Sequence, residues 1–253
     1  MIDLFHDLLK KPLELKKTHD FCPSETPQLT VVFIHGIASS STAFSRTLKY
    51  LEGTISLKNI RYVTYDLLGS GKSYKSDKLN YNYTDQITAL ENSLEKLRCT
   101  TPLVLVGHSM GALIATRYAY DHKKAVQQLI LCSSPVYTEK DLDNPAFNVA
   151  MSGFKEAVSV KNRKILKEKA FNQSIEKIVK NRKNYERLCN ITTPTVLIYG
   201  NLDKIIAAHN IPKLVKSNSK YLSAIRVPGR HGMSREKYMK IKEILEDMLY
   251  KKS

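Results

Sequence analysis

The sequence predicts an α/β fold in which a mostly parallel, doubly wound sheet is flanked by helices. Short, continuous apolar runs indicate strands that are buried on both faces, as in parallel sheets. Between these runs, apolar residues recur at helical spacing, and strands that alternate with helices form βαβ units. With 253 residues, of which 42% are hydrophobic and 25% charged, the chain is long enough to bury such a core without disulfides or metal.

Six segments are predicted as strands because each is rich in β-branched or aliphatic residues and most end at turn-forming residues. They are residues 30–35, 60–67, 103–106, 126–132, 195–199 and 224–227. In sheets of this kind ligands bind beyond the carboxyl ends of the strands. Functional residues are therefore expected directly after each strand.

Helical periodicity is clearest in two places. The residues Ile87, Leu90, Leu94 and Leu97 lie on one face of a helix, and Tyr238, Ile241, Leu245 and Met248 do the same near the C-terminus.

Residues 136–194 break the alternation, because they contain no strong strand and their apolar residues follow helical spacing. Within them, residues 151–190 carry 11 Lys and Arg against 4 Glu. The expected organisation is a core of residues 1–135 and 195–253, with residues 136–194 as a small helical cap, or lid, on the sheet. The alternative is two ordinary crossover helices joined by a long loop.

The charge balance is strongly basic, with 40 Lys and Arg against 24 Asp and Glu. Such a charge suits contact with nucleic acid or anionic lipid, but no nucleic-acid motif is present. A lysine-rich surface explains the charge more simply, and no nucleic-acid partner is expected.

Cysteine spacing and hydropathy argue against a metal-binding, secreted or membrane-spanning protein. The four cysteines form no C-x-x-C pair, and no His/Cys cluster has zinc spacing, so no metal is expected. No signal peptide is recognised at the N-terminus, and no apolar run approaches the 18 residues of a membrane span. The predicted location is the cytoplasm. The oligomeric state cannot be read from the sequence.

The strongest motif is Gly107-His108-Ser109-Met110-Gly111, a G-x-S-x-G between a predicted strand and a helical segment. This is the strand–turn–helix setting in which the motif raises a serine hydroxyl above the sheet. It also places the Met110 N–H at a helix start, where it could stabilise an oxyanion. Ser109 is therefore the candidate nucleophile.

With this motif the chain, from about residue 31 to 249, resembles the α/β-hydrolase fold superfamily, in its branch of small cytoplasmic esterase-like and lactonase-like serine hydrolases. His35-Gly36 resembles the H-G element of that superfamily, which implies that the Ile37 N–H is the second oxyanion donor. Residues 66–73 resemble its D-x-x-G-x-G-x-S loop. A phosphate-binding P-loop would need a glycine where Asp66 stands, so a structural turn is expected there.

A serine hydroxyl needs a neighbouring base, and the superfamily has the order serine, acid, histidine. His231, in a glycine-flanked loop after the last predicted strand, matches the base. Asp203 matches the acid in a G-x-x-D segment, whereas the loop after the preceding strand, residues 133–135, has no carboxylate. His35 and His108 belong to motifs in which their roles are structural.

The resemblance implies a carboxylic-ester hydrolase that acts on a small or medium acyl substrate through an acyl-enzyme, with no cofactor. Phe44, Phe147 and Phe154 are candidate pocket walls. The same triad could instead cleave thioesters, lactones or C–C bonds, or transfer acyl groups to alcohols. An alternative from another class is a ligand receptor or regulatory binder with slow turnover.

Overall fold

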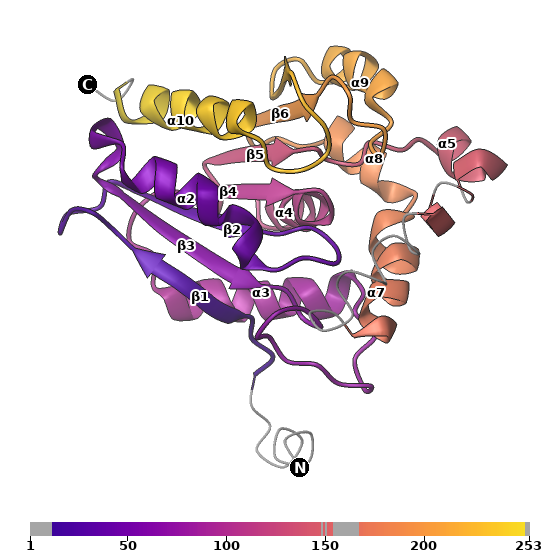
Figure 1. Ribbon diagram of the computed structural model, residues 1–253, viewed down its shortest axis with the longest axis horizontal. Coiled ribbons are helices and arrows are strands. Elements are labelled where there is room, and N and C mark those ends of the chain that lie inside the picture. Colours follow the sequence, from indigo (N-terminus) through magenta and orange to yellow (C-terminus); the bar gives the residue numbers. More distant parts are fainter. Residues whose placement is uncertain (1–11, 148, 150, 154–166, 251–253) are drawn as a thin grey trace.

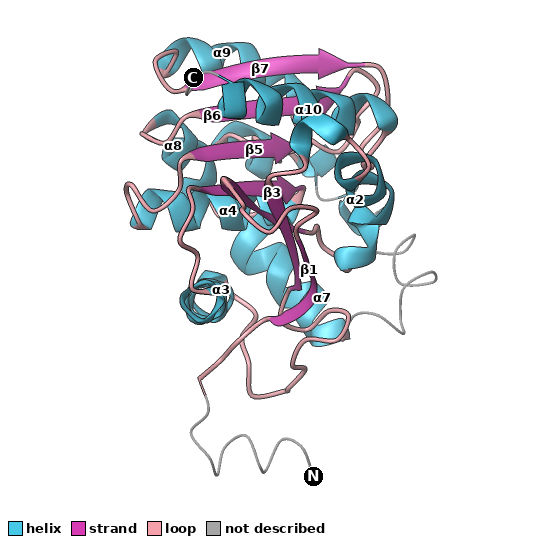
Figure 2. Ribbon diagram, turned by 90° about the vertical axis from the view of Figure 1, so that its left-hand side faces the viewer, coloured by secondary structure: helices cyan, strands magenta, loops and turns pink. Residues whose placement is uncertain are grey.

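The computed structural model describes residues 12–250 except 148, 150 and 154–166, and within them a single seven-stranded sheet dominates (Figures 1 and 2). Its strand order is β1-β3-β2-β4-β5-β6-β7, and every pair is parallel except β1 with β3. The strands are β1 (Lys16–Phe21), β2 (Leu29–Ile34), β3 (Ile60–Asp66), β4 (Leu103–His108), β5 (Gln128–Cys132), β6 (Thr195–Gly200) and β7 (Leu222–Val227). The α/β prediction and all six predicted strands are confirmed, with ends shifted by one or two residues.

The sequence did not predict β1, which pairs antiparallel with β3 at the edge of the sheet. Its residues are Lys-Lys-Thr-His-Asp-Phe, none of them buried, so the strand has neither an apolar run nor clean alternation. The register also shifts between Lys17 and His19, as in a β-bulge. Charged side chains and a bulge are typical of an edge strand that must not pair with another chain.

Successive residues of the central strands bury their side chains on opposite faces of the sheet. In β2, Val32 and Ile34 join one apolar cluster, whereas Val31 and Phe33 join the other, and all four are buried. The strands β4 and β5 alternate in the same way. Two buried faces explain why these strands read as continuous apolar runs.

Helices cover both faces of the sheet (Figure 1). On one face lie α2 (Ser45–Glu52) and α10 (Arg235–Tyr250), and on the other lie α3 (Tyr83–Leu97), α4 (Met110–Asp121), α8 (Lys183–Cys189) and α9 (Ile211–Ser217). No helix among the described residues is long and apolar enough to cross a membrane.

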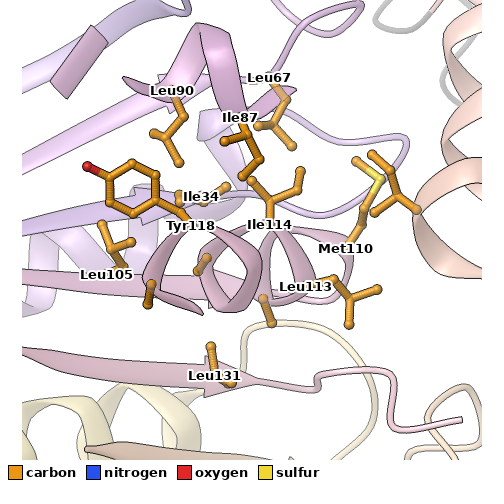
Figure 3. Packing of buried hydrophobic residues seen from close by; sticks show 14 of the residues in the cluster. Ile34, Leu67, Ile87, Leu90, Leu105, Met110, Leu113, Ile114, Tyr118 and Leu131 are labelled. Atoms are coloured by element: carbon orange, nitrogen blue, oxygen red, sulfur yellow. The ribbon is translucent and has the colours of Figure 1, made fainter. Parts of the chain in front are cut away.

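The helix α4 is packed tightly against the sheet and α3 (Figure 3). Ile114 and Leu113 are buried in the same cluster as Ile87 of α3 and Leu131 of β5. Because α4 begins directly after Ser109, this packing fixes the turn that carries the candidate nucleophile.

The segment predicted as a lid contains α5 (Glu139–Asp143), α7 (Glu168–Ser174), a π-helical turn at Ile175–Val179, and α8. Figure 1 shows α5 and α7 beyond the carboxyl ends of the strands, whereas the π-helical turn and α8 contact α4. The first part therefore lies where a lid would lie, and the last part covers the sheet as a crossover helix would. The division into core and lid stays a prediction.

Asp66, at the end of β3, ties together two loops at the carboxyl edge of the sheet. Its buried carboxylate accepts hydrogen bonds from the Ser41 N–H (2.7 Å) and the Lys72 N–H (2.8 Å). A Cβ at Gly71, where φ is +51°, would lie 2.1 Å from that carboxylate. This loop is held by hydrogen bonds within the protein, in keeping with the structural turn predicted for residues 66–73.

We expect Asp66→Asn to lower the free energy of unfolding by about 2 kcal/mol, because an amide offers only one oxygen to the Ser41 and Lys72 N–H groups, of which the Ser41 N–H is buried. Urea denaturation measures the change. The matched control is Asp77→Asn, since the Asp77 side chain is 77% exposed and such surface ion pairs contribute little. Equal stability of the two variants would contradict a structural role for Asp66.

Candidate active site

Ser109 lies in a strained turn between β4 and α4, with φ 54° and ψ −122°. Two glycines make the turn sterically feasible. A Cβ at Gly107 would lie 2.5 Å from Ala112 Cα, and one at Gly111 would lie 2.1 Å from the carbonyl oxygen of Ile34. The G-x-S-x-G spacing therefore lets the turn close on itself and lets α4 approach the end of β2.

The loop after β2 lies against the serine. A Cβ at Gly36 would be 2.9 Å from Ser109 Cβ, so this close approach requires glycine. Ile37 follows, and Met110 is the first residue of α4, whose initial N–H groups have no acceptor within the helix. Both amides thus belong to segments that adjoin Ser109, while their role as an oxyanion hole stays a prediction.

His35 is completely buried at the end of β2, as its predicted structural role requires. Its Nδ1–H donates to the Gly36 carbonyl (2.8 Å), and its Nε2 accepts from the Leu67 N–H (2.9 Å). Burial lowers the pKa of His35, so the ring is neutral and bonds the loop after β2 to the loop after β3.

The structure brings Ser109, His231 and Asp203 into one hydrogen-bonded chain. The Ser109 Oγ lies 3.0 Å from His231 Nε2, and His231 Nδ1 lies 3.0 and 3.1 Å from the two carboxylate oxygens of Asp203. With Nδ1 as the donor to the carboxylate, Nε2 is free to accept the serine proton. These are the three residues that the sequence analysis predicts as nucleophile, base and acid.

The loops that carry Asp203 and His231 are hydrogen-bonded to each other. The Asn201 N–H donates to the Val227 carbonyl (2.8 Å), and the Gly229 N–H donates to the Asn201 side chain (3.0 Å). Because β6 and β7 are neighbours in the sheet, residues 28 positions apart meet at its edge.

The Asp203 side chain is fully shielded from solvent, but it is well hydrogen-bonded. Burial alone would raise its pKa, yet hydrogen bonds from His231, the Ile205 N–H and the Ser133 hydroxyl leave the pKa below its ordinary value. The carboxylate is therefore ionised at neutral pH. An ionised acid can accept the imidazole Nδ1–H and stabilise an imidazolium.

His108 is hydrogen-bonded to the backbone of the candidate base, His231. Its Nε2–H donates to the His231 carbonyl (2.9 Å), and the two ring centroids are 5.1 Å apart. Burial, with the nearby His231 as a further cause, lowers the pKa of His108 to about 3. His108 therefore stays neutral at physiological pH, in agreement with its predicted structural role.

Lys237 is the residue at this site that the sequence analysis missed. Its side chain is completely buried, and its Nζ lies within hydrogen-bond distance of the carbonyls on either side of His231. A sequence signal existed, because Lys237 is on the same face of α10 as the buried Ile241 and Leu245. A lysine on an apolar helical stripe indicates either a helix end in water or a buried cation with partners.

A cavity of about 550 Å³ adjoins the loop that carries Asp203. Its wall is mixed: Tyr137, Phe147 and Met151 are among the apolar or aromatic members, and the polar and charged members are Asp141, Asn144, Asp203, Lys204 and His209. Ser109 is not one of the described residues that line it. Asp203 is itself a lining residue, so the cavity lies between residues 137–147 and Met151 on one side and the loop after β6 on the other.

The three phenylalanines suggested as pocket walls have different positions. Phe147 lines the cavity, with its ring centroid 4.7 Å from that of Tyr137. Phe44 does not, and the prediction for it is wrong: it is fully buried against Phe33, on the face of the sheet covered by α2 and α10. Phe154 lies outside the described residues.

The sheet order and the placement of the serine turn and the two loops define the class, an α/β-hydrolase. A family model described as serine aminopeptidase, S33 matches residues 25–189. Since the match covers more than half of the chain, the protein belongs to this family.

Among curated proteins, the chain is 37% identical over 112 residues to the probable lysophospholipase BODYGUARD 1 of Arabidopsis thaliana. That match covers 44% of this chain and 24% of the relative, so it spans about a quarter of the relative's length. Two solved structures show the same fold over nearly the whole chain. The Paleococcus ferrophilus monoacylglycerol lipase has a TM-score of 0.69 at 18% identity and covers 92% of this chain and 99% of its own. An esterase from Exiguobacterium antarcticum has a TM-score of 0.69 at 21% identity, with 94% and 96% covered.

The low pKa of His108 predicts a pH-dependent stability. An unfolded histidine has a pKa near 6.5, so between about pH 6.5 and 3 the unfolded state binds one more proton than the folded state at this residue. Stability therefore falls as the pH is lowered, by about 2 kcal/mol between pH 6.5 and 5 from His108 alone.

We expect His108→Gln, which keeps an amide donor for the His231 carbonyl, to lose about 2 kcal/mol less than the wild type between pH 7 and 5. Urea denaturation at the two pH values measures the difference. Parallel losses in the two proteins would show that His108 is not held neutral by the fold.

Proposed function

We propose that the protein hydrolyses a carboxylic ester through an acyl-enzyme, with Ser109 as nucleophile, His231 as general base and Asp203 as the orienting acid. The observation that carries this proposal is the unbroken path from Ser109 Oγ to His231 Nε2, at 3.0 Å, and from His231 Nδ1 to Asp203, at 3.0 Å. Such distances suit proton transfer without rearrangement.

In the first half of the reaction, Ser109 Oγ attacks the ester carbonyl carbon while its proton passes to His231 Nε2. The negative charge that develops on the carbonyl oxygen is stabilised by the Ile37 and Met110 amides. When the tetrahedral intermediate collapses, the imidazolium returns the proton to the departing alcohol oxygen, and the acyl group stays on Oγ. In the second half, water replaces the alcohol and the same proton transfers release the acid and free Ser109.

Asp203 contributes by fixing the tautomer of the base. Its ionised carboxylate accepts the Nδ1–H, so the lone pair of Nε2 faces the serine, and it stabilises the imidazolium that forms in each half-reaction. His35 and His108 are not alternatives to His231 as the base, since both are buried, neutral and hydrogen-bonded to backbone groups.

The substrate that we propose carries a small or medium acyl group. The apolar part of the cavity wall, which includes Phe147 and Met151, supports an apolar group on the substrate. In this proposal the segment 136–194 acts as a lid that shapes the pocket, because its first part supplies that wall. The esterase, monoacylglycerol lipase and probable lysophospholipase to which the chain is similar are named for acyl esters as well.

We expect Ser109→Ala to lower ester turnover by about 10⁴–10⁶-fold with the fold intact, because the triad members act as a unit. The measurement uses p-nitrophenyl esters of increasing acyl length, and a fluorophosphonate probe should label Ser109 in the wild type only. Thioester and aminoacyl-anilide substrates in the same panel decide the bond that is cleaved. A preference for either of these, or full activity of the variant, would refute the ester hydrolase proposed here.

We expect Asp203→Asn to lower kcat by about 10²–10⁴-fold with KM little changed, because an amide would favour the wrong histidine tautomer. Steady-state kinetics on the best ester of the panel measure the effect. Asp143→Asn is the control, since Asp143 is on α5 and its carboxylate pairs with Arg182 instead. If Asp203→Asn keeps wild-type kcat, the acid has been assigned to the wrong residue.

A further inference from the structure

The buried ammonium of Lys237 is surrounded by the backbone of the loop that carries His231. Nζ donates to three consecutive carbonyls, those of Arg230 (2.7 Å), His231 (2.9 Å) and Gly232 (2.7 Å). It also lies 2.7 Å from the hydroxyl of Ser133, at the end of β5. These partners replace the water that the side chain loses, as its complete burial requires.

The number of acceptors defines the protonation state. Four acceptors surround Nζ, the three carbonyls and the Ser133 hydroxyl, so an ammonium with three N–H groups satisfies more of them than a neutral amine with two. Burial lowers the pKa of Lys237, and the negative charge of Asp203 opposes that effect. Hydrogen bonds from Nζ to the three carbonyls also favour the charged form. The group is therefore a cation enclosed by carbonyl oxygens.

The ammonium of Lys237 lies between the backbone of His231 and the side chain of Ser133, next to the two residues that are proposed to act with Ser109. The three carbonyls bracket His231, so the ammonium fixes the backbone from which the imidazole projects toward Ser109. On its other side, Nζ donates to the Ser133 hydroxyl (2.7 Å), and Ser133 is one of the groups that hold the pKa of Asp203 below its ordinary value. One buried charge is thus in contact with the backbone of the base and, through one hydroxyl, with the acid.

Packing alone does not require a lysine here. Ile241 and Leu245 continue the same buried face of α10, and a methionine at position 237 would fill similar space without the desolvation cost of a charge. What an apolar side chain would lack is the set of hydrogen bonds to the loop of the base.

We propose that Lys237 is a positioning residue, whose ammonium holds the backbone of His231 and, through the Ser133 hydroxyl, orients Asp203. This role rests on the proposed function, because it assigns Lys237 to the geometry of that triad. Displacements of about 1 Å in such a site can cost about 100-fold in rate, so the predicted effect falls on kcat more than on KM.

The first test is Lys237→Met, assayed well below its melting temperature with the best ester of the panel. We expect kcat to fall by about 10–100-fold while KM stays within about twofold. The matched control is Lys240→Met on the same helix, whose ammonium pairs with Glu243 on the surface, and it should keep wild-type kinetics. A folded Lys237→Met protein with wild-type kcat would overturn the proposal.

The second test observes the triad directly. In ¹⁵N-histidine-labelled protein, the proton between His231 Nδ1 and Asp203 should give a low-field ¹H NMR signal. We expect this signal to be lost or shifted in Lys237→Met and unchanged in Lys240→Met. A lysine with a purely structural role would lower the melting temperature and leave the signal as it is in the wild type, which would overturn the proposal.

If Lys237→Met does not fold, Ser133→Ala decides, because it leaves the three carbonyl bonds of the ammonium in place. We expect kcat to fall by about 10-fold and the low-field signal to move. The control is the neighbouring Ser134→Ala, which removes a buried hydroxyl that has no hydrogen-bond partner among the described residues and should change neither. Wild-type kcat and an unchanged signal in Ser133→Ala would overturn the proposal.

The two proposals can fail separately. If wild-type protein hydrolyses no ester of the panel, the proposed function fails, but the NMR comparison still reports whether Lys237 and Ser133 position His231 and Asp203. If the ester is cleaved and Ser109 is labelled while the Lys237 and Ser133 variants behave as wild type, only the positioning role fails.

Discussion

The contact on which the rest of the site depends is the close approach of α4 to the end of β2. At Gly111 there is room only for a hydrogen, because a Cβ would lie 2.1 Å from the Ile34 carbonyl oxygen. This contact places the start of α4 against the loop of Gly36 and forces Ser109 into a backbone conformation with positive φ. The strain in the turn is offset by the packing of Ile114 and its neighbours between α3 and the sheet (Figure 3).

Asp203 and His231, the proposed acid and base, need no such strain, because the sheet itself brings them together. Parallel strands end at a common edge, so the loops after β6 and β7 adjoin each other, and the Asn201 and Leu202 N–H groups donate to the carbonyls of Val227 and Gly229. His231 then meets Ser109 from a loop 122 residues further along the chain. Each of the three groups is thus carried by a separate loop on a shared rigid support, which is how a site achieves precise geometry.

How much the sequence predicts depends on whether a constraint is local. The six parallel strands, the serine turn and the loops of Asp203 and His231 are visible because each has a local pattern of apolar runs or glycines. The edge strand β1 has none, since its polar residues are specified only by pairing with β3. The place of Lys237 on an apolar helical face was a local signal, but its carbonyl partners, like the surroundings of Phe44, are a tertiary property that the sequence does not show.

Two buried charged side chains hold loops around the site. The negative one bonds backbone N–H groups, and the positive one bonds backbone carbonyls. Asp66 accepts from the amides of Ser41 and Lys72, whereas Lys237 donates to the carbonyls of residues 230–232. Loops have no ladder of their own in which to satisfy their N–H and C=O groups, so a charged side chain can saturate several at once. Because backbone groups are present whatever the side chains are, this support does not depend on the identity of most loop residues. It leaves the residues that face the cavity free to define the substrate, while the geometry of Ser109, His231 and Asp203 stays fixed.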